Sequence, residues 1–187
     1  MMDAFGYLSV LLSIILGLAI AQVLQGYRAL LLAKGRVHVD PAPLIWSGVI
    51  LLFAAQAWWA SFGLNARHDW DFLDFAVILI QMGLLYMISA IVLPDVPPEH
   101  SVDLAGHFER HRKAFFAFLI AMLASSITKE FILEHRFTSR VNLAFHAVFA
   151  AAAVAGIIFS GRKVQLALAL FGLVSFLAYI AVLFARL

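Results

Sequence analysis

Apolar residues along the chain gather into six long segments that are separated by short polar stretches. The first runs from about Phe5 to Leu32 and stops just before Gly35, a residue type that favours helix C-termini. A helix needs about 20 mostly apolar residues to cross the hydrocarbon core of a bilayer. The pattern therefore predicts an all-α fold of six transmembrane helices in one domain, residues 1–187. The other five segments cover about Pro43–Leu64, Asp71–Leu93, residues 114–135 with a start as early as Leu104, Val141–Phe159 and Lys163–Phe184.

The fourth segment differs from the others because charged residues interrupt it. Its uninterrupted apolar part, Ala114–Thr128, would reach only about 22 Å as a helix, whereas the hydrocarbon core is about 30 Å thick. A spanning helix must therefore continue through Lys129 and Glu130. Two interpretations follow: these side chains extend to the membrane interface, or they lie in a polar cavity that the protein uses.

Composition places the chain among polytopic membrane proteins. The chain is 64% hydrophobic and 13% charged, with a mean hydropathy of +0.98. It has no cysteine, which excludes disulfides, thiolate metal sites and a cysteine nucleophile. The leader carries Asp3 and no Lys or Arg, unlike a secretory signal, so we expect the first segment to be retained as a span. No basic run suggests a nucleic-acid partner.

The long polar stretch at residues 94–113 divides the chain into two possible halves, 1–94 and 101–187. Three spans in each half would give the halves opposite orientations, as in the inverted repeats of many transporters. Short helices in lipid resemble one another by composition, so two unrelated halves explain the pattern as well. Loops on the side of residues 94–113 carry more Lys and Arg than the terminal side. This bias predicts periplasmic termini.

The first segment carries a row of small or polar residues at a spacing of four. Such a row lies on one helix face and lets another helix approach closely. In the alternative interpretation, Gln22 and Gln25 belong to a polar lining. The row consists of Ser9, Ser13, Gly17, Ala21 and Gln25.

Further polar residues lie within the fourth and fifth segments. Ser125 and Ser126 precede Lys129 and Glu130 by one helical turn, and Asn142 and His146 share a helix face. An ionisable group at membrane depth is a candidate functional residue. His146 is either a neutral imidazole bonded to a neighbouring helix or a proton acceptor, since imidazole titrates near neutral pH.

Two histidines, His107 and His111, are also spaced by four, which can place two imidazoles on one metal ion. A charged surface helix explains the same residues without a metal. A haem needs histidines facing one another within the membrane, and only His146 is clearly intramembrane. We find no GxSxG, nucleotide-binding loop or HExxH motif, so the sequence does not favour an enzyme. Asp71 and Asp74 fit the start of a helix.

Several stretches resemble a group of small six-span proteins of the bacterial inner membrane. They are "FGYLSVLLSIILGLAIAQVL", the tryptophan pair at 58–59, "DWDF", "IVLPD" at 91–95 and "NLAFH" at 142–146. The resemblance covers most of the chain and implies a bacterial inner-membrane location. It implies no activity.

The sequence thus predicts a small channel or secondary transporter for an ion or small polar solute. An alternative is a membrane scaffold or an accessory subunit of a larger complex, and a third is an intramembrane metal or haem protein. We expect the lipid bilayer as partner, with a homodimer or membrane complex possible, and no resident cofactor apart from a metal at His107 and His111. The candidate lining residues are Lys129, Glu130, Asn142, His146, Ser125, Ser126, Gln22 and Gln25.

Overall fold

The computed structural model describes residues 4–33, 35–67, 69–96, 101–134 and 139–183. Within these ranges the chain forms six long α-helices, as the hydropathy pattern predicts, and all six are long and apolar enough to cross a membrane. The helices are α1 (Ala4–Leu32), α2 (Pro41–Ser61), α3 (Phe72–Val92), α4 (Leu104–Glu134), α5 (Arg140–Ile158) and α6 (Arg162–Leu183), with a 3₁₀ helix η1 (Phe62–Ala66) and two short strands, β1 (Val37–His38) and β2 (Val102–Asp103).

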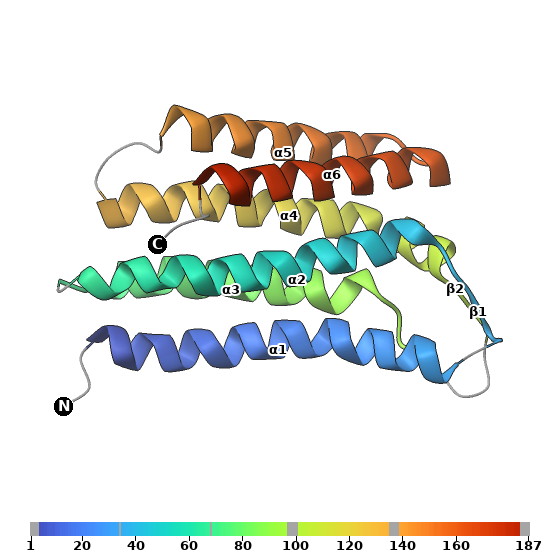
Figure 1. The fold of residues 1–187 in the computed structure, drawn as a ribbon, viewed down its shortest axis with the longest axis horizontal. Helices are drawn as coiled ribbons and strands as arrows, with labels where there is room; N and C mark the ends of the chain where they lie inside the picture. The colour runs from blue at the N-terminus through green and yellow to red at the C-terminus, as the bar shows by residue number, and fades with distance from the viewer. Residues whose placement is uncertain (1–3, 34, 68, 97–100, 135–138, 184–187) are drawn as a thin grey trace.

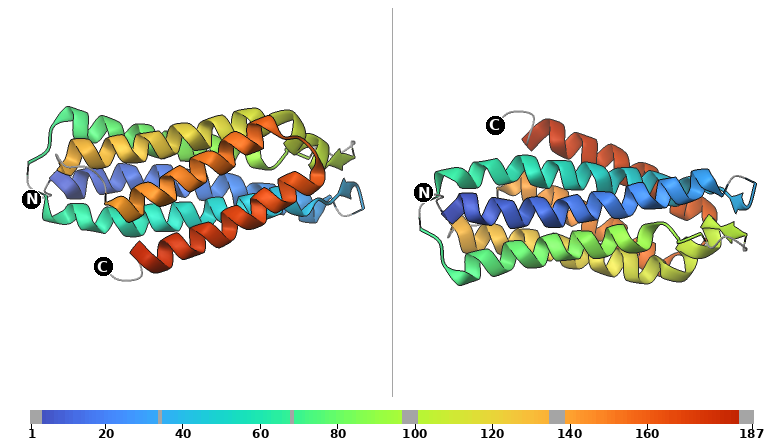
Figure 2. Two further views of the ribbon diagram at one scale, coloured as in Figure 1. Left: turned by 90° about the horizontal axis from the view of Figure 1, so that it is seen from above. Right: turned by 90° about the horizontal axis from the view of Figure 1, so that it is seen from below.

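The helices lie side by side along one axis (Figure 1). α1 begins and α6 ends at one end of this bundle, which we call the terminal end; β1 and β2 lie at the other, the loop end. α3 packs against α1 and α4, whereas α6 packs against α2 and α5. Figure 2 shows that α6 crosses the bundle obliquely and diverges from it toward the terminal end. The inverted repeat stays a prediction.

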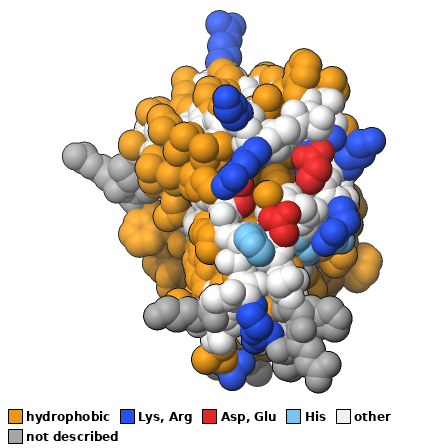
Figure 3. Space-filling view, turned by 90° about the vertical axis from the view of Figure 1, so that its right-hand side faces the viewer, with side chains coloured by type: hydrophobic (Ala, Val, Ile, Leu, Met, Phe, Trp, Pro, Cys, Tyr) orange, Lys and Arg blue, Asp and Glu red, His pale blue; other side chains and the backbone are white. Residues whose placement is uncertain are grey.

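The sides of the bundle are apolar, and charge gathers at its ends. Val10, Ile14 and Leu18 of α1 and Val174 of α6 are each more than half exposed, as expected for side chains that face lipid. Figure 3 looks onto the loop end, where basic, acidic and histidine side chains cluster. The protein is a multi-pass membrane protein.

Short polar motifs set the helix starts. Asp40 caps α2 by accepting a hydrogen bond from the Ala42 N–H at 3.0 Å. At α3, Asp71 accepts from the Asp74 N–H at 2.8 Å, and the Asp74 carboxylate accepts in return from the Asp71 N–H at 3.4 Å. The prediction that Asp71 and Asp74 mark a helix start is confirmed.

The fourth helix continues through its charged residues. α4 begins at Leu104, the earlier of the starts that the sequence allows, and passes through Lys129 and Glu130 to end at Glu134. At about 1.5 Å per residue its length is about 46 Å, which exceeds the hydrocarbon thickness of about 30 Å. The charges interrupt the apolar run but not the helix.

Aromatic side chains fill the half of the bundle nearer the loop end. Trp46 on α2 meets Phe115 and Phe116 of α4 edge to face, with ring centroids 5.3 and 5.6 Å apart, and all three are almost fully buried. Gly156 on α5 lies against the Phe116 ring, and Gly172 on α6 lies against Trp46. The loop half is therefore closely packed.

A buried arginine fastens the α5–α6 hairpin to α4 at the loop end. The Arg112 guanidinium donates to the carbonyl oxygens of Gly156 and Ile157 at 2.7 and 2.6 Å, and to that of Phe159 at 3.4 Å. The last carbonyls of a helix have no partner within it, so an outside donor is needed in a dry environment. Arg162 also pairs with Asp40, which joins the hairpin to α2.

A two-residue strand pair, which the sequence pattern did not predict, closes the loop end. β1 and β2 are parallel, with Val37 beside Val102 and His38 beside Asp103. The Val102 N–H also donates to the Arg36 carbonyl at 2.9 Å. The segment after α1 is thereby tied to the segment before α4.

The close contact at Gly156 gives a stability test. A Cβ at this position would overlap the Phe116 ring, so Gly156→Ala should destabilise the fold by about 1–3 kcal/mol. Gly48→Ala on α2 is the matched control, because a Cβ there meets nothing within 4 Å. Thermal unfolding in detergent should show a lower melting temperature for Gly156→Ala alone. Equal melting temperatures would contradict the close packing of α5 on α4.

Candidate functional site

A cavity of about 510 Å³ extends inward from η1 at the terminal end. Its walls come from α2, α3, α4, α5 and α6, at the end where α6 diverges from the bundle (Figure 2). We call it the outer cavity. Its polar lining residues are Gln56, Arg67, Gln81, Ser126, Lys129, Glu130, Asn142 and Tyr179.

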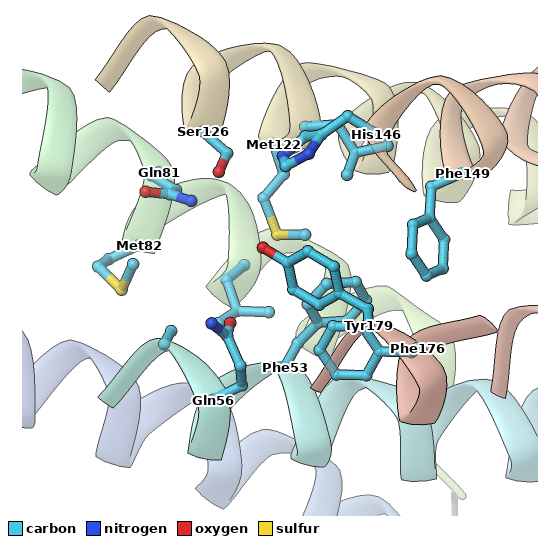
Figure 4. Close-up of a pocket in the computed structure, with 13 residues that line it drawn as sticks. Phe53, Gln56, Gln81, Met82, Met122, Ser126, His146, Phe149, Phe176 and Tyr179 are labelled. Atoms are coloured by element: carbon cyan, nitrogen blue, oxygen red, sulfur yellow. The ribbon is translucent and has the colours of Figure 1, made fainter. Parts of the chain in front are cut away.

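A smaller inner cavity of about 40 Å³ adjoins the outer one toward the middle of the bundle. The two share several lining residues, so they form one continuous recess. Figure 4 shows Gln81, Ser126 and the Tyr179 hydroxyl pointing into the space between the helices. Apart from His146, the residues that line only the inner cavity are apolar: Phe53, Met82, Leu85, Met122, Leu123, Phe149 and Phe176.

The recess ends against aromatic rings. The Phe53 and Phe176 ring centroids are 3.9 Å apart, and Phe149 lies 6.0 Å from Phe176. The Trp46 and Phe116 rings fill the layer beyond, toward the loop end. The recess is therefore open at the terminal end and closed by packed rings in the middle of the bundle.

Consecutive residues of α4 place opposite charges on this recess. The side chains of Lys129 and Glu130 diverge by about 100° around the helix. Glu130 accepts a hydrogen bond from the Asn142 amide of α5 at 2.9 Å. Lys129 makes no hydrogen bond or ion pair within the described ranges. It also borders a further cavity of about 50 Å³ that α1, α2 and α3 line.

Contacts at the terminal end show how deep these residues lie. Arg67 donates to the Leu133 carbonyl of α4 and pairs with Asp74 of α3 at 2.7 Å. This contact places Leu133 level with the first turn of α3. Lys129 is one turn further in, about 6 Å, and Ser126 is about 10 Å in. Lys129 thus lies further from the terminal end than the first turn of α3, at the wall of the outer cavity.

Two acceptor atoms in the recess lack a partner. Gln81 Oε1 and Asn142 Oδ1 are buried and accept no hydrogen bond from any described residue. Buried polar atoms are nearly always paired with protein or water, and leaving one unpaired costs about 1–3 kcal/mol. A bound solute or water would satisfy both atoms. The recess therefore offers acceptors on α3 and α5 and a cationic donor on α4.

The structure brings together five of the eight candidate lining residues: Ser126, Lys129, Glu130, Asn142 and His146. The other three lie elsewhere. The Ser125 hydroxyl is buried outside both cavities, and Gln22 bonds to the Tyr86 hydroxyl of α3 at 3.2 Å. Gln25 is exposed.

Sequence analysis missed Gln56, Gln81, Arg67 and Tyr179. The two glutamines carry a signal, because each is a lone amide inside an apolar run, in "LLFAAQAWW" and "VILIQMGLL". No such sequence signal marks Arg67 or Tyr179, since their positions at the recess depend on how the helices pack.

The histidine pair lies near the loop end. His107 Nε2 donates to the Ile91 carbonyl at 3.0 Å, and His111 Nδ1 donates to the His107 carbonyl at 3.0 Å. In the part of the chain that the structure describes, no three His, Asp or Glu side chains gather as metal ligands. A metal here would need ligands from elsewhere, so this site stays a prediction.

Comparison of the chain with protein-family models, curated proteins and solved structures found no match. The functional argument therefore rests on the geometry of the recess.

Two adjacent serines test the recess directly, because the chain has no native cysteine. A cysteine in place of Ser126 should react with an impermeant methanethiosulfonate added at the terminal side, since Ser126 lines both cavities. Ser125→Cys is the matched control and should stay unlabelled in the folded protein. Mass spectrometry would measure the labelled fraction. Equal labelling of both variants would contradict a recess that is open at the terminal end and lined by Ser126 but not by Ser125.

Proposed function

We propose that the protein is a secondary transporter for a small polar solute and that the recess is its binding site in one access state. The recess supports this because it carries charged and amide side chains well below the first turn of α3. Polar groups within a membrane domain are expensive and commonly mark solute pathways. Within the described residues there is no soluble domain to which another function could be assigned.

A transporter fits the recess better than a channel does. A channel needs a continuous polar path, whereas this recess stops at Phe53 and Phe176. In alternating access, one side of a central site closes while the other opens. The packed loop half would be the closed side, and the terminal end the open one.

The loop end carries contacts that such a cycle would have to break. Another cavity, of about 430 Å³, lies there, bordered by Asp40, Glu109 and Arg162. Asp40 pairs with Arg162 across it, and Arg112 holds the end of α5 nearby. Release of these contacts would let the α5–α6 hairpin move and connect the inner cavity to the loop end.

The proposed location is the bacterial inner membrane with periplasmic termini. The distribution of Lys and Arg and the resemblance described above support it. The recess would then face the periplasm, and the cycle proposed here would connect it to the cytoplasm.

A scaffold is the second candidate function, and the outer face of α1 favours it. Ser13 and Gly17 are exposed, and a Cβ at Gly17 would meet nothing within 4 Å. Small exposed residues let a partner helix pack closely. Gentle solubilisation that yields a stoichiometric partner, together with absent transport, would favour the scaffold.

Transport can be tested in proteoliposomes with a pool of labelled amino acids, sugars and carboxylic acids. Lys129→Gln should reduce uptake of the transported solute at least tenfold, because it removes the recess cation without a partner among the described residues. Lys113→Gln, at an exposed position of α4 nearer the loop end, should leave uptake unchanged. Uptake no faster than in empty liposomes for every member of the pool would contradict the proposal.

A further inference from the structure

The charges of the recess lie toward opposite walls. Lys129 borders the small cavity that it shares with Leu12 and Ile78, so it lies on the side of α1, α2 and α3. Glu130 lies toward α5, where Asn142 donates to it. The outer cavity thus has a cationic side and an anionic side, a few ångströms apart along α4.

The anionic side is rich in acceptors. The Glu130 carboxylate, which accepts from the Asn142 amide, brings negative charge to this side, and Asn142 Oδ1 has no partner within the described ranges. Gln81 Oε1 adds a second unsatisfied acceptor to the same cavity. An ammonium group carries three donors and no acceptor, so it matches this set.

The cationic side, at Lys129, matches a negatively charged acceptor. The Lys129 ammonium is a donor without an acceptor among the described residues. A carboxylate has acceptor sites only, and its bond to an ammonium is stronger than a neutral hydrogen bond. A carboxylate at Lys129 would give this ammonium an acceptor.

The inner cavity specifies the rest of the ligand. His146, which donates to the Asn142 carbonyl of its own helix at 2.9 Å, lines one part of it; the walls at Phe53, Met82, Met122 and Phe176 are apolar, and the volume is about 40 Å³. Such a space accepts a small apolar group and no further charge. The polar end of a ligand would stay in the outer cavity beside Ser126 and Tyr179.

We infer that the solute is a small zwitterion with an apolar side chain, of the α-amino acid class. Its carboxylate binds Lys129, its ammonium binds Glu130 with Asn142 and Gln81, and its side chain enters the inner cavity. This inference rests on the proposed function, because it assigns the ligand of the same recess. A ligand without a carboxylate would leave Lys129 without an acceptor, and a ligand without an ammonium would leave Gln81 Oε1 and Asn142 Oδ1 without a donor, which is how the site selects.

Three matched probes test the inference on the protein in lipid nanodiscs: L-valine, isobutylamine, which lacks the carboxylate, and 3-methylbutanoate, which lacks the ammonium. Calorimetric titration should give a dissociation constant for L-valine at least tenfold below that of either analogue. Equal or tighter binding of one analogue would overturn the inference, and so would the absence of binding by L-valine.

Charge-removing variants assign each end of the ligand. Lys129→Gln should abolish the preference for L-valine over isobutylamine and keep the preference over 3-methylbutanoate. Glu130→Gln should do the reverse, and Lys113→Gln should keep both preferences. Each preference is a ratio within one variant, so a smaller folded fraction does not change it. Loss of both preferences in both variants would overturn the two-sided assignment.

The outcome separates this inference from the proposed function. If a sugar or a carboxylic acid from the labelled pool crosses the membrane and L-valine does not bind, only the zwitterion assignment fails. If nothing in the pool crosses and no probe binds, the transporter proposal fails with it.

Discussion

The position of the α5–α6 hairpin depends on the hydrogen bonds that the Arg112 guanidinium donates to α5. The last carbonyl groups of a helix have no donor within it, and the buried Arg112 supplies donors to the last turn of α5 from the neighbouring helix. The turn between α5 and α6 is therefore held at the loop end, with the Asp40–Arg162 pair as a second fastening. Because the hairpin is held there, α6 can diverge toward the terminal end, where the recess lies.

The loop half of the bundle is closely packed, whereas the terminal half carries the polar recess. The loop half packs Trp46, Phe115 and Phe116 against glycines of α5 and α6, and this packing closes the inner end of the recess. The helices of the terminal half instead present amide, hydroxyl and charged side chains to the recess. The recess between the halves therefore has polar walls and an aromatic floor.

Much of the fold and part of the candidate site could be predicted from the sequence. Long apolar runs give the helices, and Asp71 with Asp74 gives the start of α3, because both signals are local. Lys129 and Glu130 stood out because charge is rare within a membrane span. The direction in which each side chain points could not be predicted. Ser125 and Ser126 look alike in the apolar stretch of α4, and only packing decides which one lines the recess. The strand pair gave no periodic signal, since each strand has only two residues.

The β1–β2 pair has a consequence for biosynthesis. A strand after the first helix pairs with a strand before the fourth, so the pair cannot form until translation has passed Asp103. During synthesis the segment after α1 therefore stays unpaired at least until β2 has been made. The Arg162 contact to Asp40 comes later still, when the last hairpin leaves the ribosome. The last hairpin thus docks onto helices that were made before it.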